Sequence, residues 1–320
     1  MSITSTVKSM RFSAPALKGF TWTTRELSAP VLGSRLCIMT GMHVNEVSSI
    51  AAGFRLDLKF RELLIRGSIS IMSFANIPAL LPRTEFNCPM DGKNINFCFP
   101  GSREGTFSEA FADAVLNEWA GDADCLIDLH GGDLCERVSK FAVVQATDDR
   151  AFDAFNLKLA QAFEAQLIMA LPAAEISKSG RSCTGRAQKG LHAVFAEAGG
   201  NGLIDEESVG FHVDGVLRVA QLYGMIESAP PPAAASLIAD RYSWRMAESE
   251  GWYEFHVSPG EPVAEGQILG VVRDFEGGDP KNLVSTETGY LLWRATHPIV
   301  RQSDPLMGIA SRIRARPTEA

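Results

Sequence analysis

The alternation of short apolar runs with longer segments of helical period, over the first 226 residues, limits the fold more than any other feature. Apolar runs of four to eight residues or slightly more predict strands, and an apolar residue at every third or fourth position predicts a helix. Strands are predicted at 35–42, 64–74, 124–130, 140–146, 166–171 and 192–199, and helices at 47–60, 109–120, 151–165 and 213–226. Such alternation is typical of a sheet with crossover helices. We therefore predict an α/β fold with a mixed, mostly parallel sheet flanked by helices.

A proline-rich segment divides the chain. Residues 228–236, SAPPPAAAS, contain three consecutive prolines, which exclude a continuing helix or a central strand. Downstream, turn-rich segments with glycine and proline separate short apolar runs at 252–257, 268–272 and 289–295. This spacing is typical of a small all-β module. We predict an α/β domain at 1–230 and a small β-barrel or sandwich domain at 231–320.

Charge and cysteine content narrow the classes of partner. The formal net charge is −8, whereas nucleic acids and anionic membranes normally require a basic patch, so we expect neither partner. The six cysteines form no C-x-x-C pair, which predicts reduced thiols. The first twenty residues lack the uninterrupted apolar stretch of a signal peptide, and no run of about 18 apolar residues occurs. We expect a cytoplasmic protein, and a homo-oligomer stays open.

Three residues suited to bind a metal ion follow two of the predicted strands. His43 and Glu46 lie on the turn between the strand at 35–42 and the next helix, and their three-residue spacing places both side chains on one side of the backbone. His130 ends the apolar run at 124–130. In an open α/β sheet, sites form beyond the carboxyl ends of the strands. Two imidazoles and a carboxylate, with a fourth position open to water, predict one catalytic zinc ion per chain.

A further carboxylate is predicted to serve as the base. Glu197 ends the apolar run at 192–199 and stands before paired glycines, as His130 does. A carboxylate beside water activated by zinc acts as a general base and then passes the proton to the leaving nitrogen. This arrangement predicts a metal-dependent hydrolase of amide or related acyl bonds.

The motif order resembles that of the succinylglutamate desuccinylase and aspartoacylase family, which is related to the zinc carboxypeptidases. The segments that carry the resemblance are TGMHVNE (40–46), NIPA (76–79), DGKNINFCFPG (91–101), DLHGG (128–132) and EAGG (197–200). The D-G-x-x-x-N-x-x-F-P-G form is similar to that of bacterial members of the N-acyl-diaminobutyrate deacetylase type. The resemblance implies zinc at His43, Glu46 and His130, Glu197 as base and proton shuttle, and a small N-acylated substrate.

Two positions depart from the family pattern. The family usually has glycine after the first zinc histidine, where this chain has Val44, a β-branched residue that adds bulk beside the metal. The family's asparagine-arginine pair, which holds a substrate carboxylate, reads Asn96-Phe97 here. A guanidinium binds a carboxylate through two hydrogen bonds, whereas phenylalanine offers an apolar face. We predict that Asn96 and Phe97 contact the substrate with half of the usual carboxylate clamp missing.

Another arginine is expected to compensate. Arg83, Arg103, Arg181 and Arg186 all lie in polar, loop-like stretches near the motif segments. Arg83 is the preferred candidate because it lies between NIPA and the asparagine motif, where the family places an arginine that polarises the scissile carbonyl. A positive group there stabilises the developing oxyanion.

Two other functions stay open. A metallocarboxypeptidase that acts on peptide C-termini shares the metal geometry, but it requires a reliable arginine for the terminal carboxylate. A non-catalytic relative that keeps the fold and binds a ligand or the metal is suggested by Val44 and Phe97.

Overall fold

The computed structural model describes residues 3–84, 86–231 and 236–314. The first eight strands are β1 (Thr4–Met10), β2 (Trp22–Ser28), β3 (Val31–Met39), β4 (Arg66–Met72), β5 (Cys125–His130), β6 (Glu136–Gln145), β7 (Leu167–Leu171) and β8 (His192–Gly200). The α-helices are α1 (Val47–Leu63), α2 (Phe107–Ala114), α3 (Arg150–Gln161), α4 (Ser182–Ala187) and α5 (Glu206–Leu222), and a π-helical segment (Val115–Trp119) continues α2. Among the described helices, none has both the length and the apolar content needed to span a lipid bilayer.

These strands form a mixed sheet in the order β1-β2-β4-β3-β5-β8-β6-β7. The central strands β4, β3, β5 and β8 are parallel, whereas β1 and β2 form an antiparallel hairpin that pairs with β4, and β6 is antiparallel to β8. The α/β fold with a mixed sheet is confirmed. The expectation that the sheet is mostly parallel is not confirmed.

The connection between β5 and β6 explains this difference. Only residues 131–135 separate the two strands, and a parallel crossover requires a dozen or more residues. The sequence pattern placed the start of β6 at residue 140, whereas the strand begins at Glu136. The connection between β5 and β6 therefore looks longer in the sequence than it is, and for that reason the antiparallel orientation of β6 was not predicted. The N-terminal hairpin was also missed, because β1 is largely exposed and has no apolar run.

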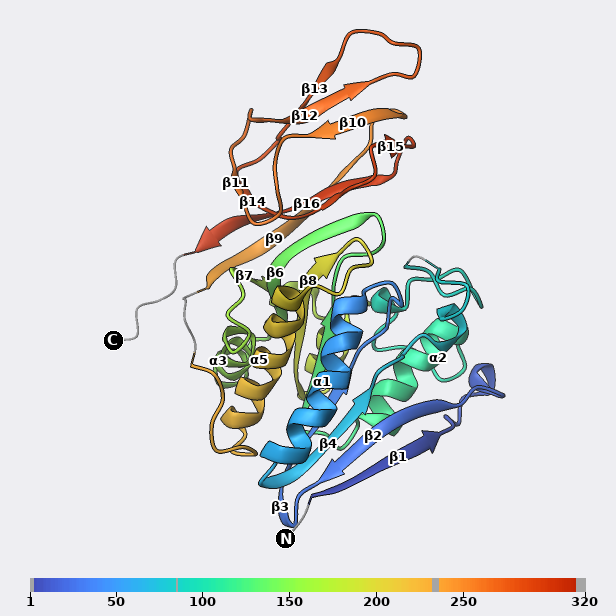
Figure 1. The fold of residues 1–320 in the computed structure, drawn as a ribbon, viewed down its shortest axis with the longest axis vertical. Coiled ribbons are helices and arrows are strands. Elements are labelled where there is room, and N and C mark those ends of the chain that lie inside the picture. Colours follow the sequence, from blue (N-terminus) through green and yellow to red (C-terminus); the bar gives the residue numbers. More distant parts are fainter. Residues whose placement is uncertain (1–2, 85, 232–235, 315–320) are drawn as a thin grey trace.

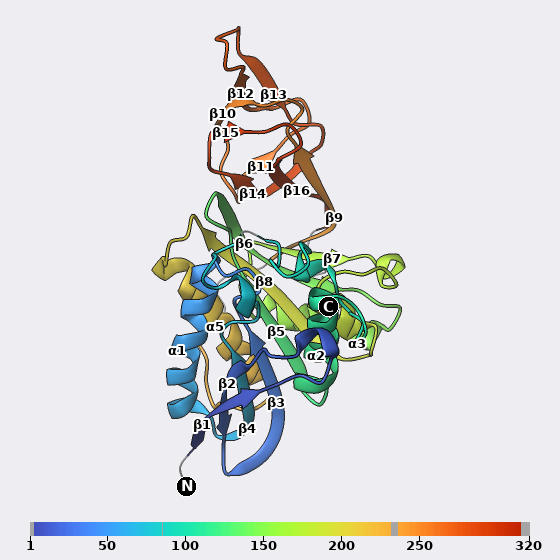
Figure 2. The ribbon, with the colours of Figure 1, turned by 90° about the vertical axis from the view of Figure 1, so that its right-hand side faces the viewer.

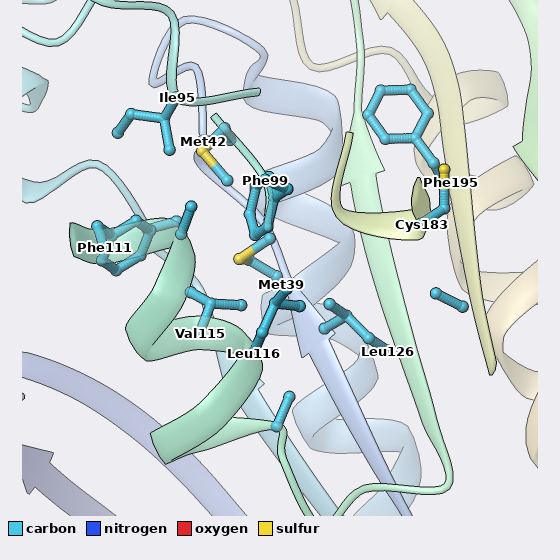
Figure 3. Close-up of a cluster of buried hydrophobic side chains, with 14 of the residues drawn as sticks. Met39, Met42, Ile95, Phe99, Phe111, Val115, Leu116, Leu126, Cys183 and Phe195 are labelled. Atoms are coloured by element: carbon cyan, nitrogen blue, oxygen red, sulfur yellow. The ribbon is translucent and has the colours of Figure 1, made fainter. Parts of the chain in front are cut away.

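Helices cover both faces of the sheet (Figure 1). Helices α1, α3 and α5 pack on one face over a core that includes Leu56, Phe163 and Val216. Helices α2 and α4 pack on the other face over a second core. Figure 3 shows part of this second core, in which Met39 of β3 and Leu126 of β5 lie close to side chains from α2 and its continuation. Both faces of the central strands are therefore buried, as their continuous apolar runs predicted.

All regular elements in the described part of the chain after residue 236 are strands. They are β9 (Leu237–Met246), β10 (Gly251–Phe255), β11 (Pro262–Val263), β12 (Ile268–Arg273), β13 (Lys281–Val284), β14 (Gly289–Ala295), β15 (Ile299–Val300) and β16 (Pro305–Arg314). Strands β9, β16, β14 and β11 extend the main sheet beyond β7 to twelve strands, while β13, β12, β10 and β15 form a second sheet. A separate apolar core fills this region.

The all-β C-terminal region sits over one end of the main sheet (Figures 1 and 2). Besides the pairing of β9 with β7, strand β14 pairs with the start of β6. The predicted linker at 228–236 includes residues 232–235, which lie outside the described residues. The division into domains at 1–230 and 231–320 stays a prediction.

Candidate metal centre

The three predicted metal ligands lie at the carboxyl ends of two neighbouring parallel strands. Strand β3 ends at Met39, and the turn that follows it carries His43 and then Glu46, the residue that precedes the first turn of α1. Strand β5 ends at His130. Because β3 and β5 are paired in parallel, their carboxyl ends meet at the same edge of the sheet. The fold thus brings together residues that are up to 87 positions apart in the chain, 130 less 43.

The ligand atoms of these residues converge. One donor atom from each of His43, Glu46 and His130 lies within 4.8 Å of the others. The Nδ1 of His43 is 2.6 Å from Oε1 of Glu46, and the Nδ1 of His130 is 2.9 Å from Oε2 of the same carboxylate. All three side chains are buried, with 5% or less of each exposed. Two imidazoles and a carboxylate are a donor set that zinc accepts.

The outer nitrogens of both imidazoles face oxygen acceptors. Nε2 of His43 lies 3.0 Å from Oδ1 of Asn94, and the backbone N–H of Asn96 donates to the same oxygen, which fixes it as an acceptor. Nε2 of His130 lies 3.1 Å from Oδ1 of Asp128. The acceptor Oδ1 of Asn94 indicates that Nε2 is the protonated nitrogen of His43, and the Asp128 carboxylate, which contacts Nε2 of His130 outside hydrogen-bond geometry, favours the same tautomer there. In a neutral imidazole the lone pair then lies on Nδ1.

This arrangement fits a bound cation. With both rings neutral, two Nδ1 lone pairs point at the Glu46 carboxylate, and only a positive charge among the three donors makes the contact favourable. Burial lowers the pKa of His43 and His130, but the facing carboxylates outweigh it, and both pKa values are raised above 6.5. Burial by itself would raise the pKa of Glu46, but the charges of the two histidines and their hydrogen bonds to Glu46 lower this pKa to about 2. The donor set can hold a metal ion, and protons are its natural competitors.

Glu197 lies beside the metal centre. Strand β8 pairs in parallel with β5, and Glu197 stands directly opposite His130, so the two side chains lie on the same face of the sheet. Burial and the negative charge of Glu46 raise the pKa of Glu197 to about 7. Burial and the charges of Glu197 and Glu46 also raise the pKa of Glu136 well above its usual value. A carboxyl group with a pKa near 7 is suited to take up and release a proton.

The predicted substrate residues differ in their accessibility. Asn96 is buried, and its Oδ1 has no hydrogen-bond partner. Phe97 is 42% exposed. Val44, the residue after the first histidine, is 8% exposed and is therefore part of the packing around the centre.

The four candidate arginines occupy different environments. Arg181 precedes α4, and its guanidinium carbon lies 5.5 Å from the ring centroids of both Phe97 and Phe195. Its Nε is buried without a hydrogen-bond partner. Arg186 is fully buried and donates to the carbonyl oxygens of Ala120 and Ala123, which is a structural role.

The remaining two arginines are exposed. Arg103 has a solvent-exposed contact of 3.8 Å with Glu104. Arg83 has an exposed side chain and a left-handed backbone with φ of 52°, and its carbonyl accepts a hydrogen bond from Asn45. Its assignment as the carbonyl-polarising arginine stays a prediction.

Asp128, Ser182 and Asn94 belong to the site but did not emerge from the sequence. Asp128 is fully buried, and its second oxygen accepts a hydrogen bond of 2.5 Å from Ser182, the first residue of α4. The signal for Asp128 was available, since residues two apart on a strand share a face and Asp128 precedes His130 by two. Ser182 carried no such signal, because only the packing of α4 against β5 brings it near.

A cavity of about 720 Å³ opens beside the metal centre. Asn94, which contacts His43, and Phe86, whose ring centroid lies 5.4 Å from that of His43, form part of its wall. The opposite wall comes from the C-terminal β region and includes Trp244 and Trp293. The C-terminal region therefore forms part of the cavity beside the centre.

Comparisons with known proteins identify the family of this chain. Residues 32–223 match the family model described as the succinylglutamate desuccinylase/aspartoacylase catalytic domain. An N-alpha-acetyl-L-2,4-diaminobutyric acid deacetylase of Halomonas elongata is 27% identical over 284 residues, which cover 87% of this chain and 82% of the relative.

Two solved structures share the fold. The product-bound structure of the ectoine utilization protein EutE (DoeB) from Ruegeria pomeroyi has a TM-score of 0.83 at 21% identity. A succinylglutamate desuccinylase/aspartoacylase from Rhodobacter sphaeroides has a TM-score of 0.82 at 22% identity. Each comparison covers 97% of this chain and 95% of the other. On the match to its catalytic domain, the chain belongs to the succinylglutamate desuccinylase/aspartoacylase family.

Proposed function

We propose that this chain is a zinc-dependent hydrolase that cleaves the amide bond of a small N-acyl amino acid or amine. The observation that carries the proposal is the convergence of the Nδ1 atoms of His43 and His130 on the Glu46 carboxylate, with Glu197 opposite His130. The name of the Halomonas relative, a deacetylase of an N-acetylated amino acid, supports the reaction type.

In the proposed mechanism, His43, Glu46 and His130 hold the ion. When bound there, zinc supplies Lewis-acid polarisation of the scissile carbonyl and lowers the pKa of water toward 7. The ionised Glu197 takes a proton from the attacking water, and a pKa raised toward 7 lets the same group return that proton to the nitrogen of the leaving amine. Asn94 and Asp128 keep the imidazoles oriented through their Nε2 atoms.

Arg181 is the arginine that we propose for the substrate carboxylate. Its guanidinium lies against Phe97, the residue that stands where the family pattern has an arginine. Its Nε has no hydrogen-bond partner. Its positive charge also acts to lower the pKa of Glu197, which indicates that the two groups are near each other. A guanidinium held between two aromatic rings presents its free N–H groups in a fixed direction.

Zinc content and turnover test the proposal together. We expect the purified protein to contain about one zinc per chain and to release amine from members of an N-acyl amino acid panel. Replacement Glu197→Gln keeps the shape but removes the base, so we expect zinc to be retained and kcat to fall by about 10²- to 10⁴-fold. Glu265→Gln, an exposed glutamate of the C-terminal region, is the matched control. Undiminished activity of Glu197→Gln would refute the mechanism.

A second pair of variants distinguishes the arginines. Arg181→Met is expected to raise KM for N-acyl amino acids relative to N-acyl amines that lack the carboxylate, by about 10-fold or more. Arg83→Met is expected to lower kcat instead if Arg83 polarises the carbonyl. Equal effects of Arg181→Met on both substrate types would remove it from carboxylate binding.

The alternative functions are less well supported. A carboxypeptidase requires room for a peptide chain, whereas residues of the C-terminal region form one wall of the cavity. A non-catalytic binding protein would bind an acylated ligand without turnover in the presence of zinc. The cytoplasm is the proposed compartment, which the six free cysteines support.

A further inference from the structure

Strands from both regions of the chain close into a barrel. The main sheet continues in the order β6-β7-β9-β16-β14, and β14 pairs back onto β6. Figures 1 and 2 show β9, β14 and β16 over the end of the main sheet. Tyr242 of β9 is partly buried and packs against the core that contains Phe195 of β8. Because Phe195 and Glu197 share a face of β8, Tyr242 lies on the side of the sheet that carries the base.

The hydroxyl of Tyr242 is held from within the C-terminal region. The indole N–H of Trp293, a residue of the cavity wall, donates to the Tyr242 oxygen. Both groups lie over the backbone of Gly308 in β16, where a Cβ atom would collide with Trp293 and come within 2.7 Å of the Tyr242 oxygen. Among the described residues, no acceptor takes the hydroxyl hydrogen of Tyr242. The phenol therefore offers a hydrogen-bond donor in a fixed place.

Arg181 approaches the same place from the α/β region. Its guanidinium carbon lies 5.5 Å from the ring centroids of Phe97, which is in the cavity wall, and of Phe195, whose ring stacks on His130 at 4.3 Å. Its Nε is buried without a partner. Of the neighbouring charges, that of Arg181 has the largest influence on the pKa of Tyr242. The two side chains are therefore near each other, between the cavity wall and the metal centre.

The surroundings keep the phenol protonated. Burial raises the pKa of Tyr242 well above its usual value, and the charges of Glu197 and Glu136 act in the same direction, against the charge of Arg181. Tyr242 therefore stays a neutral donor at any pH used in an assay. These two carboxylates oppose the binding of an anion, which Arg181 attracts. A neutral donor beside the guanidinium adds a hydrogen bond to an anionic oxygen without adding charge.

We propose that Tyr242 is a substrate-binding residue, whose hydroxyl, held by Trp293, donates to the same substrate carboxylate as Arg181. The C-terminal region then supplies part of the substrate site itself. The proposal rests on the proposed hydrolase function and adds a specificity-determining residue to it. It explains why a hydroxyl that accepts from Trp293 has its own hydrogen available beside an arginine with an unpartnered Nε.

Two compounds that differ only in the carboxylate test the role of the hydroxyl. N-acetylnorleucine carries the carboxylate, and N-pentylacetamide is the same molecule without it. Tyr242→Phe removes the oxygen and keeps the ring, so we expect KM for N-acetylnorleucine to rise about 10-fold while kcat and the KM for N-pentylacetamide change by less than about twofold. Tyr253→Phe, which removes a hydroxyl that donates to the carbonyl of Ser249 in the same region, is the matched control and should leave both values unchanged.

A purely structural role of Tyr242 predicts a different result. Loss of the hydroxyl leaves the Trp293 N–H without its acceptor, which would disturb the site for both compounds alike. In an Arg181→Met background, Tyr242→Phe should have a smaller effect, about threefold or less, because the carboxylate is no longer held beside it. Equal losses for both compounds in a variant that circular dichroism shows to be folded, or no loss for either, would overturn the proposal.

Binding without turnover separates this proposal from the hydrolase function. Calorimetric titrations of the zinc-loaded Glu197→Gln variant, with and without Tyr242→Phe, use the same two compounds. Binding of N-acetylnorleucine that weakens about 10-fold with Tyr242→Phe supports the role of the hydroxyl even if the wild-type protein hydrolyses nothing, in which case only the hydrolase function fails. No preference of Glu197→Gln for N-acetylnorleucine over N-pentylacetamide would overturn the proposal, because Arg181 and Tyr242 would then hold no carboxylate.

Discussion

Replacement of Asp128 by asparagine measures how much the buried negative charge next to His130 contributes to zinc binding. Asp128 is completely buried, with one oxygen 3.1 Å from Nε2 of His130 and the other bonded to the hydroxyl of Ser182. Asparagine has nearly the same shape, and its carbonyl oxygen still faces Nε2 of His130. Its amide then donates to the Ser182 oxygen, whose hydroxyl must turn away. The change removes one negative charge and leaves the geometry in place.

The size of the effect follows from the type of hydrogen bond that is lost. A hydrogen bond to a charged group contributes about 1.5–3 kcal/mol, against about 0.5–1.5 kcal/mol for a neutral one. The difference of about 1–1.5 kcal/mol corresponds to roughly 10-fold in an equilibrium constant. Losses of 10- to 100-fold in metal affinity are typical for partners of metal-bound histidines. We therefore expect Asp128→Asn to weaken zinc binding by about 10- to 100-fold.

Competition with a chromogenic zinc chelator at fixed pH measures this change directly. Asp148→Asn, at an exposed position, is the matched control and should bind zinc as the wild type does. Circular dichroism establishes that the variant is folded, and Ser182→Ala, which removes only the neutral donor, should have the smaller effect. Wild-type zinc affinity in a folded Asp128→Asn protein would refute the reasoning, because His130 would then not depend on the charge behind it.

Three further outcomes are expected. Zinc affinity should fall as the pH is lowered, because the raised pKa values of His43 and His130 mean that two protons must leave before the ion binds. The fall should reach about 100-fold per pH unit once both histidines are protonated. A chelator titration that gives a flat profile from pH 8 to 6 contradicts this. The value of kcat/KM should rise with pH, because Glu197 acts in its ionised form. The apparent pKa should lie above 4.5 and at or below about 7, since a nearby cation counteracts the upward shift of the Glu197 pKa. If the fall in kcat/KM at acidic pH persists in Glu197→Gln, it belongs to another group. Trp22→Phe should lower the free energy of unfolding by about 2–4 kcal/mol in urea titrations. The reason is that the fully buried indole fills the core and donates a 2.8 Å hydrogen bond to the carbonyl of Ala75. A change below about 0.5 kcal/mol would show that this core readjusts.

Local sequence patterns predicted the central sheet well. The predicted strands at 124–130 and 192–199 match β5 and β8 to within a residue, because strands buried on both faces consist of continuous apolar residues. Helix α5 begins at Glu206, seven residues before the predicted start at 213, since its first turn is acidic and follows an aspartate cap that the apolar period does not reveal.

The sequence by itself determined the ligands and the base as a set of candidates, since the order of strands and the glycines that follow them restrict where His43, Glu46, His130 and Glu197 can lie. Tertiary structure alone decided what surrounds them. The tautomers of the imidazoles depend on Asn94 and Asp128, and the cavity depends on tryptophans from β9 and β14. These contacts join segments that are distant in the chain, and no local period of the sequence encodes which distant side chains will meet.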